Sequence, residues 1–384
     1  MYVRDLVVGG RLPDIRQFSR TYSFFSYPVG AELHRYLSDR FGDEYVVRMY
    51  EEYRLYDSFE AALEGILGVD LDRLSEEWRY ALEKRFFPRY AERPPLDVGT
   101  RPIVTEGSAN FKPVIYAPPG DSTAQLLFLS PRSGYTNLYL APLDEGDQAE
   151  TVLEGERSPE FESFHAFESG FDVSADGIVV LASKFMEHDA LILWSLADRE
   201  VVGRYQWDDL VGLRSPAWAP DGRQVVFEGL NTAGLSDLYR FDFDAQRRTA
   251  LTADVYRDRD PDWSADGATI AFASDRTRFG ADGYTNLFAL DVERGTIRPL
   301  TSGRWNDQHP RWSHDGSRLA FSSDREGVFD LYAIDAHGNG SRLTALTGGA
   351  FDPEWLPGDT GLVFAGYHEG TFRIYRQDFG PDTA

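Results

Sequence analysis

The chain has 384 residues, a formal net charge of −24 and no cysteine. This length can hold two or more domains around a buried core, and the lack of cysteine excludes disulfides, thiol nucleophiles and cysteine-based zinc sites. The acidic balance argues against nucleic acid as a partner, because phosphate binding needs clustered Lys and Arg. No apolar run approaches the roughly 18 residues that span a bilayer, and no secretion signal is visible at the start.

The first part of the chain has a helical pattern. Apolar residues recur at helical spacing over 33–41, and Gly42 follows as a C-terminal helix residue. The string Asp-Ser-Phe-Glu at 57–60 has the form of a capping box, which predicts a short helix that Gly68 ends.

A third helix carries apolar residues on one stripe over 71–86. We expect Pro88 and the Arg-Pro-Pro stretch at 93–95 to break helicity and to mark a linker. The chain therefore divides into a predicted α-helical segment over residues 1–95 and a second domain over residues 96–384.

Beyond the linker the pattern changes to period two, and a short string with a central Trp and a closing turn repeats. Its four clear copies and two degenerate ones are 215–222, 260–267, 309–316, 352–358, 112–120 and 171–177. Two apolar strands follow each clear copy, and in three of them an outer strand then ends in Leu-Thr. The Asp-Gly pairs are typical hairpin turns. Four strands per unit at a period of about 45 residues indicate propeller blades.

The two ends of the repeat array complement each other. The sixth copy stops after its third strand near Phe379, and the segment 101–105 resembles the missing outer strand. Pairing this segment with the sixth blade would close the ring and remove its exposed edges. We predict a mainly β fold, a six-bladed β-propeller preceded by an α-helical segment.

The strings Trp-Ser-x-Asp-Gly at 263–267 and 312–316, each followed by Ser-Asp-Arg at 274–276 or 323–325, carry a resemblance. They resemble the WD-related repeats of the TolB-type β-propeller, whose usual ring has six blades. This resemblance implies a bacterial, periplasmic or otherwise extracytoplasmic protein. Propellers of this type serve as scaffolds, as peptidase gates and, in a few branches, as lyases.

The helical segment resembles a different family. Residues 27–42 and 58–78 are similar to the C-terminal part of gluzincin-type zinc peptidases, in which the motif H-E-x-x-H comes earlier in the chain. The nearest strings here, at 34–38 and 368–372, lack the second His that zinc requires. The resemblance implies that the chain is peptidase-associated, the C-terminal part of a longer protein whose upstream catalytic domain would be its partner.

Residues near the repeated Pro form the candidate binding site. In a propeller the innermost strands line the central channel, and residues just ahead of this Pro face its mouth. The predicted ligand-binding residues are Lys112, Arg214, Arg259, Asp260, Gln308, His309, Phe351 and Asp352. Such a chemically mixed ring is typical of a mouth that binds a peptide or protein segment. Ordinary strand-end hydrogen bonding is the alternative explanation.

Other polar patterns give weaker signals. Asp258, Asp260 and Asp262 would share one face of a strand, but the Gly and Glu of a calcium loop are missing, so we expect a salt-bridge cluster with Arg257 and Arg259. Only one of the seven His falls at the mouth, which makes a poor metal site. The repeated Trp residues are interpreted as packing between blades, and the Ser-Asp-Arg strings as blade-corner hydrogen bonds.

No catalytic residue, metal ligand or cofactor is predicted. The sequence favours a non-catalytic module that binds protein or peptide at the channel mouth. One alternative is the accessory region of a zinc metallopeptidase whose H-E-x-x-H domain lies outside this chain. A metal-dependent sugar lyase is the second alternative.

Overall fold

The computed structural model describes residues 2–18, 26–118, 120, 123–155, 161, 169–186, 188–335 and 338–380. The chain separates into two compact units, Met1–Arg93 with His368–Gly370 and Pro94–Tyr367 with Thr371–Ala384. Within the described residues, no helix is long and apolar enough to cross a membrane.

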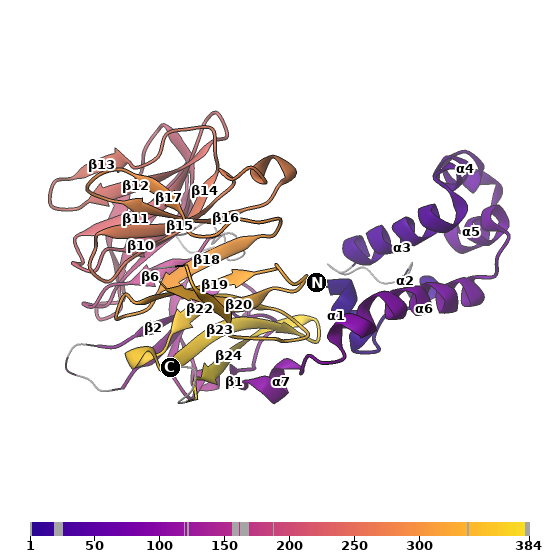
Figure 1. The fold of residues 1–384 in the computed structure, drawn as a ribbon, viewed down its shortest axis with the longest axis horizontal. Helices are drawn as coiled ribbons and strands as arrows, with labels where there is room; N and C mark the ends of the chain where they lie inside the picture. Colours follow the sequence, from indigo (N-terminus) through magenta and orange to yellow (C-terminus); the bar gives the residue numbers. More distant parts are fainter. Residues whose placement is uncertain are drawn as a thin grey trace. The chain divides into compact units, whose positions relative to one another are not determined.

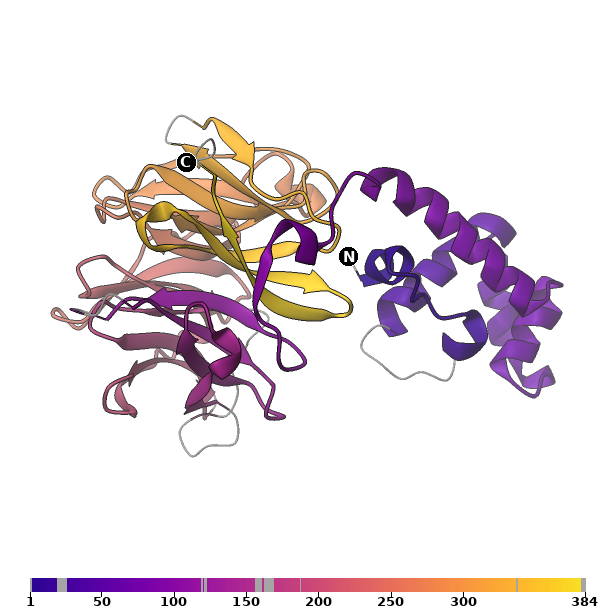
Figure 2. The same cartoon turned by 90° about the horizontal axis from the view of Figure 1, so that it is seen from below.

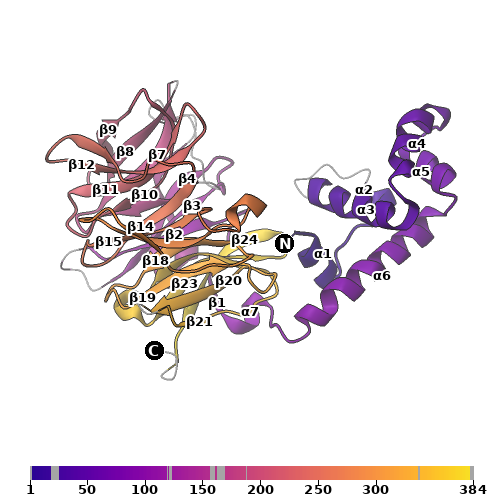
Figure 3. The same ribbon diagram turned by 45° about the horizontal axis from the view of Figure 1, so that its top comes forward.

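The first unit is helical. Its elements are α1 (Tyr2–Val8), α2 (Ile15–Phe18), α3 (Ser26–Phe41), α4 (Glu44–Glu52), the 3-10 turn η1 (Tyr53–Leu55), α5 (Phe59–Leu67) and α6 (Leu71–Tyr90). The longest helix, α6, contacts α1, α2 and α5 (Figure 3). Leu33 and Leu37 of α3 pack with Trp78 of α6 in one buried cluster, so the predicted helical stripes form a single core.

The ends of α5 follow local sequence signals. Ser58 is the N-cap, and its Oγ accepts a hydrogen bond from Ala61 N at 3.1 Å. Gly68 closes the helix in the left-handed conformation at φ 67°. The third residue after the cap is Ala61 rather than Glu, so the cap is a single bond instead of the reciprocal pair of a capping box.

Replacing Ser58 by Ala should destabilise the helical unit by about 1 kcal/mol, because the N–H of Ala61 loses its acceptor. Urea unfolding followed by helical circular dichroism measures this loss. Asp57→Ala, at the exposed neighbouring position, is the control and should leave the transition within about 0.5 kcal/mol of wild type. Equal midpoints for the two variants would show that the cap contributes nothing.

The expectation that Pro88 breaks the third helix is wrong. α6 continues through Pro88 to Tyr90. A Pro in this place removes one backbone hydrogen bond and crowds the carbonyl four residues earlier, at a cost of about 3 kcal/mol in a helix interior. Burial of Tyr90, at 6% exposure, holds the last turn in place, and Arg4 stacks over its ring at 5.0 Å.

The second unit is a β-propeller. Its described strands form six four-stranded sheets, here called blades 1 to 6 (Figure 1). Blade 1 comprises β2 (Phe111–Tyr116), β3 (Gln125–Ser130), β4 (Asn137–Pro142) and β5 (Glu150–Glu154). Blade 2 comprises β6 (Phe171–Val173), β7 (Ile178–Phe185), β8 (His188–Ser195) and β9 (Glu200–Tyr205). Blade 3 comprises β10 (Leu210–Trp218), β11 (Gln224–Asn231), β12 (Ser236–Asp242) and β13 (Arg247–Ala250).

Blades 4 and 5 repeat the pattern, and blade 6 completes the ring. Blade 4 comprises β14 (Asp258–Trp263), β15 (Thr269–Ser274), β16 (Asn286–Asp291) and β17 (Ile297–Pro299). Blade 5 comprises β18 (Asp307–Trp312), β19 (Arg318–Ser323), β20 (Asp330–Asp335) and β21 (Gly340–Arg342). Blade 6 comprises β22 (Ala350–Trp355), β23 (Gly361–His368), β24 (Thr371–Asp378) and β1 (Arg101–Val104). The short helix α7 (Leu96–Gly99) precedes β1, and the 3-10 turns η2 (Gly146–Gln148), η3 (Gly280–Asp282) and η4 (Pro357–Asp359) lie between strands.

The predicted closure of the ring is confirmed. β1 pairs antiparallel with β24, with Arg101 opposite Arg376 and Val104 opposite Ile374. The first strand of the propeller thus lies beside its last (Figures 1 and 2). Closure leaves blade 6 with four strands although the sixth repeat supplies three.

A pair of aromatic rings in contact recurs in the blade cores. In five blades the second strand carries a fully buried Phe that packs on an aromatic of the third strand: Phe128–Tyr139, Phe227–Tyr239, Phe272–Phe288, Phe321–Tyr332 and Phe364–Tyr375. Burying one such side chain contributes about 1.5–3 kcal/mol, and the ring pairing adds about 0.5–1.5 kcal/mol.

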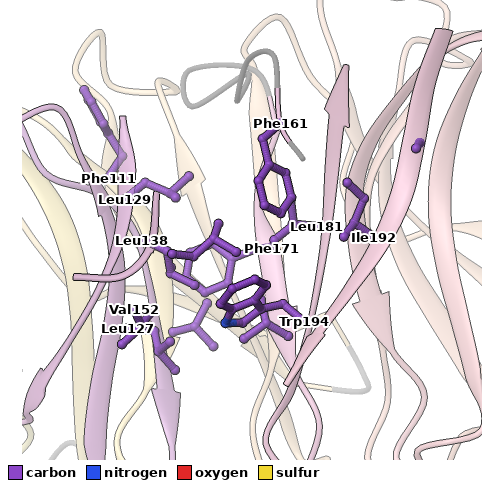
Figure 4. Close-up of a cluster of buried hydrophobic side chains, with 14 residues drawn as sticks. Phe111, Leu127, Leu129, Leu138, Val152, Phe161, Phe171, Leu181, Ile192 and Trp194 are labelled. Carbon is purple, nitrogen blue, oxygen red and sulfur yellow. The ribbon is translucent and has the colours of Figure 1, made fainter. Parts of the chain in front are cut away.

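Blade 2 uses aliphatic residues instead. Between blades 1 and 2, Leu181 and Ile192 pack with Leu129 and Phe171 in a buried cluster (Figure 4). The Trp194 ring meets Phe161 edge-on at a centroid distance of 6.3 Å. The degenerate repeats therefore still fold as full blades, because their apolar positions are kept even where the Trp string is lost.

Candidate functional site

A distortion of the innermost strands creates the site. In blades 1, 3, 4, 5 and 6 the register slips by a bulge, and the residue before the repeated Pro is left-handed: Lys112, Ser215, Asp260, His309 and Asp352 have φ between 45° and 52°. This conformation costs a non-glycine residue roughly 1–2 kcal/mol. A bulge re-aims side chains, and five of them are turned into the channel here. Strained backbone of this kind clusters at functional sites.

The re-aimed side chains form one polar ring. Lys112 Nζ donates to Asp352 Oδ1 at 2.8 Å and lies 3.2 Å from His309 Nε2. His309 also approaches Asp352 Oδ1 through Nδ1 at 3.0 Å. Ser215 Oγ donates to Asp260 Oδ1 at 3.1 Å. We call Lys112, Ser215, Asp260, His309 and Asp352 the mouth ring.

The two carboxylates of the mouth ring are held in their ionised form. Burial would raise the pKa of Asp352, but the charges of Lys112 and His309 outweigh it and hold the pKa well below its usual value. For Asp260, burial is likewise outweighed by His309 and Lys112, and its pKa is lowered. At neutral pH both groups are therefore hydrogen-bond acceptors rather than proton donors.

The mouth ring surrounds a small cavity. Its volume is about 90 Å³, and Gly170 of blade 2 lines it together with the mouth ring. At about 30 Å³ per water, this space holds about three waters or the tip of one side chain.

Arg311 lies between the cavity of the mouth ring and a second cavity, and its side chain lines both. Its guanidinium contacts Asp172 of blade 2 at 3.1 Å, Asp262 of blade 4 at 3.0 Å and Glu354 of blade 6 at 2.6 Å. We call these four residues the channel plug. Burial raises the pKa of Asp262 to about 6 and also raises that of Glu354, since three carboxylates share one guanidinium.

A second cavity of about 330 Å³ lies beyond the plug and is lined by Trp218, Trp263, Trp312 and Trp355. Trp218 Nε1 donates to Ile178 O of the preceding blade at 3.0 Å. Trp355 Nε1 donates to Arg311 O of its preceding blade at 2.9 Å. For these two, the predicted role in packing between blades is confirmed.

The predicted site residues fall into two groups. Lys112, Asp260, His309 and Asp352 come together in the mouth ring, whereas the other four do not line the cavity. Arg259 is exposed, Arg214 lies 3.8 Å from buried Glu228, Gln308 pairs in the ladder with Ser322, and Phe351 packs on Phe329 and Phe372. One step along a bulged strand thus separates the residues that line the cavity from those that do not.

The expectation that three Asp residues share one strand face is wrong. The bulge between Arg259 and Asp262 breaks the alternation of β14. Asp258 pairs with Arg276, Asp260 joins the mouth ring and Asp262 binds Arg311, so the three Asp residues have different partners.

The blade-corner role of the Ser-Asp-Arg strings is confirmed. Arg276 Nε donates to Ser274 Oγ at 3.0 Å, and Arg325 Nε donates to Ser323 Oγ at 2.9 Å. Each guanidinium also pairs with the Asp that opens the innermost strand of its blade, Asp258 or Asp307.

Sequence reasoning missed the channel plug. Its members occupy one repeat column, two residues beyond the mouth-ring position. Three carboxylates and one Arg at equivalent positions of the repeats, on strands that face the channel axis, could have indicated an ion-pair cluster in the channel. Glu228 was also missed, because nothing local marks its burial at 2% exposure. Burial raises the pKa of Glu228 to about 7, and Ser236 Oγ donates to it at 2.7 Å.

The sequence of the chain was compared with protein families and with curated proteins. No family model matches the chain. An uncharacterized protein of Agrobacterium fabrum is 28% identical over 159 residues, which are 39% of this chain and 52% of that protein. The chain thus spans about half the length of this curated relative.

Among solved structures, a putative TolB from Agrobacterium tumefaciens matches with a TM-score of 0.50 at 19% identity, over 71% of this chain and 91% of that one. The propeller is TolB-like in its fold. A gluconolactonase from Xanthomonas campestris matches with a TM-score of 0.52 at 16% identity, over 74% of this chain and 93% of that one. Because a gluconolactonase also has this fold, the fold by itself does not show whether the chain is an enzyme.

Proposed function

We propose that this protein is a non-catalytic binding module that takes a peptide or protein segment at the mouth ring. The observation that carries the proposal is the convergence of five strained residues from five blades on one cavity. The TolB-like fold supports an extracytoplasmic location for this module.

The chemistry of the mouth ring favours binding over catalysis. Asp260 and Asp352 have lowered pKa values and stay ionised, and Lys112 is held by Asp352 at 2.8 Å. A carboxylate serves in general acid–base catalysis when it titrates near the working pH, so Asp260 and Asp352 are unsuited to that role. Fixed donors and acceptors around a shallow cavity instead suit the polar tip of one inserted side chain, with neighbouring residues resting on the rim.

A peptide-display selection against the full chain tests this proposal. His309→Asn with Asp352→Asn should weaken the selected peptides by about tenfold or more, since two polar contacts of the mouth ring change. Asn tolerates the left-handed backbone at both positions, so the fold should persist. Thermal unfolding of the variant checks this.

The control is His314→Asn, which changes a histidine beyond the channel plug, where its Nδ1 lies 2.8 Å from Asp359. Its affinity for the same peptides should equal that of wild type. A selection that enriches no peptide, or peptides that bind the double variant as well as wild type, would reject the mouth ring as the binding site.

A second proposal concerns the helical unit. We infer from its resemblance to a gluzincin tail that the propeller is the accessory region of a zinc metallopeptidase. The helices α3, α5 and α6 cover the segments that carry the resemblance. Sequencing the gene upstream of Met1 decides this: an in-frame H-E-x-x-H motif is expected, and a reading frame that begins at Met1 would contradict it.

A further inference from the structure

The corner of blades 3 and 4 and the corner of blades 4 and 5 share one construction. A Thr two residues beyond the outer strand accepts a hydrogen bond from the third strand, as Thr252 Oγ1 does from Leu238 N and Thr301 Oγ1 does from Leu287 N. Four further residues surround this Thr. One belongs to the third strand, one to the loop after the Thr, one begins the next blade, and the fourth is an Arg that follows the second strand of that next blade. At the corner of blades 4 and 5 these are Asn286, Gly303, Asp307 and Arg325, and at the corner of blades 3 and 4 they are Asp237, Asp254, Asp258 and Arg276.

The corner of blades 4 and 5 is balanced. Asp307 is its one carboxylate: Oδ1 pairs with Arg325 at 3.0 Å, and Oδ2 accepts from Thr301 Oγ1 at 2.6 Å and from Trp305 Nε1 at 3.0 Å. The amide of Asn286 accepts from Gly303 N at 3.1 Å. One guanidinium therefore neutralises one carboxylate, and both oxygens of that carboxylate are bonded.

The corner of blades 3 and 4 carries an excess of two negative charges. Arg276 is shared between Asp254 at 3.0 Å and Asp258 at 2.5 Å. Asp237, at 4% exposure, accepts hydrogen bonds from Thr252 Oγ1 and from Asp254 N. Burial raises the pKa of both Asp237 and Asp258, as expected where carboxylates outnumber cations.

Asp258 supplies a second, independent observation. Its side chain is fully buried, and among the described residues its Oδ1 makes no hydrogen bond, unlike both oxygens of Asp307. Carboxylate oxygens of Asp237, Asp254 and Asp258 lie within 4.8 Å of one another. A buried carboxylate oxygen left without a donor costs stability unless something positive approaches it.

We propose that Asp237, Asp254 and Asp258 bind a hard divalent cation at the corner of blades 3 and 4. Three carboxylates are the oxygen ligands that Ca²⁺ and Mg²⁺ prefer, and Thr252 Oγ1 and water complete the set. The cation reaches the site past Asp254, whose side chain is 35% exposed. Arg276 keeps its place over the rings of Tyr256 and Phe272, at 5.2 and 5.5 Å, and is not displaced.

Thermal unfolding of the full chain with Ca²⁺ as the probe tests the site. Calcium at about a hundredfold excess over its Kd should raise the Tm of wild type by about 3–6 °C relative to chelator. Calorimetric titration should give one site per chain. No shift and no binding heat with Ca²⁺, Mg²⁺ or Mn²⁺ at about 10 mM would overturn the proposal.

The repeats supply matched variants. Asn stands at the position of Asp237 in blades 1 and 4, as Asn137 and Asn286, so Asp237→Asn should fold. This variant should lose the calcium shift and should unfold at a higher temperature than wild type in chelator, because one uncompensated charge is removed. Asp254→Asn, at a half-exposed position, gives an independent variant with the same expected loss.

Asp330→Asn is the control, since Asp330 holds the same place in blade 5 and accepts from Leu346 N at 3.0 Å. Its corner has Leu346 and Ala350 where the proposed site has Asp254 and Asp258. It should keep the full calcium shift. A calcium shift that survives in Asp237→Asn and Asp254→Asn would place any bound cation elsewhere and reject this site.

Discussion

Replacing Arg311 by Met should destabilise the propeller by about 3–5 kcal/mol, because it leaves three buried carboxylates without their shared cation. Asp172, Asp262 and Glu354 come from three different blades, and Arg311 adds the fourth. Its loss therefore removes contacts across the whole ring. Urea unfolding followed by Trp fluorescence measures the effect.

The control for this prediction is Arg199→Met, which breaks an exposed ion pair with Glu150 and should cost less than about 1 kcal/mol. Acid should partly rescue Arg311→Met. Burial raises the pKa of Asp262 to about 6 even beside Arg311, and loss of the guanidinium should raise it further. The variant should therefore take up protons on its buried carboxylates at a higher pH than wild type, and the penalty of their ionised form disappears as they do so. The gap to wild type should thus narrow from about pH 7 to about pH 5. A pH-independent gap, or a loss no larger than that of Arg199→Met, would refute the role of the plug.

Replacing Val104 by Asp should destabilise the propeller by about 4 kcal/mol or more, because it buries an unpaired charge at the seam of the ring. Val104 is fully buried, lies opposite Ile374 on β24 and packs with Leu126, Phe128 and Val363 of blades 1 and 6. Thermal unfolding of the full chain measures the change.

Arg101→Asp introduces the same residue at an exposed position of the same strand and should shift the Tm far less. If both variants unfold at the same temperature, β1 does not hold the ring closed. If only Val104→Asp unfolds early, the seam is a point on which the whole propeller depends.

Much of the fold could be predicted because its signals are local. Ser58 and Gly68 bound α5 through their own backbone preferences, and each blade repeats the same turns and apolar positions. Closure by residues 101–104 followed from a count of strands. The prediction that the third helix ends at Pro88 is wrong, because burial of Tyr90 in the folded chain outweighs the local penalty of one lost hydrogen bond.

The candidate site was predictable only in part. The repeated Pro marked where Lys112, Asp260, His309 and Asp352 would lie, since repeats place equivalent residues at equivalent points of the ring. The four residues one step earlier do not line the cavity, because the bulges re-aim successive side chains in ways that a regular strand pattern does not show, and their part in binding stays a prediction.

The sequence by itself determined the six-bladed architecture and the mouth of its channel, since periodic turns and strands act over a few residues. Tertiary structure alone decided how that mouth is built. Arg311 meets Asp172 across 139 positions of sequence, and Lys112 meets Asp352 across 240. Such contacts form only when the ring closes and when left-handed residues at the bulges turn side chains toward the channel axis. Two side chains then meet because of their positions around this axis, whatever their separation along the chain.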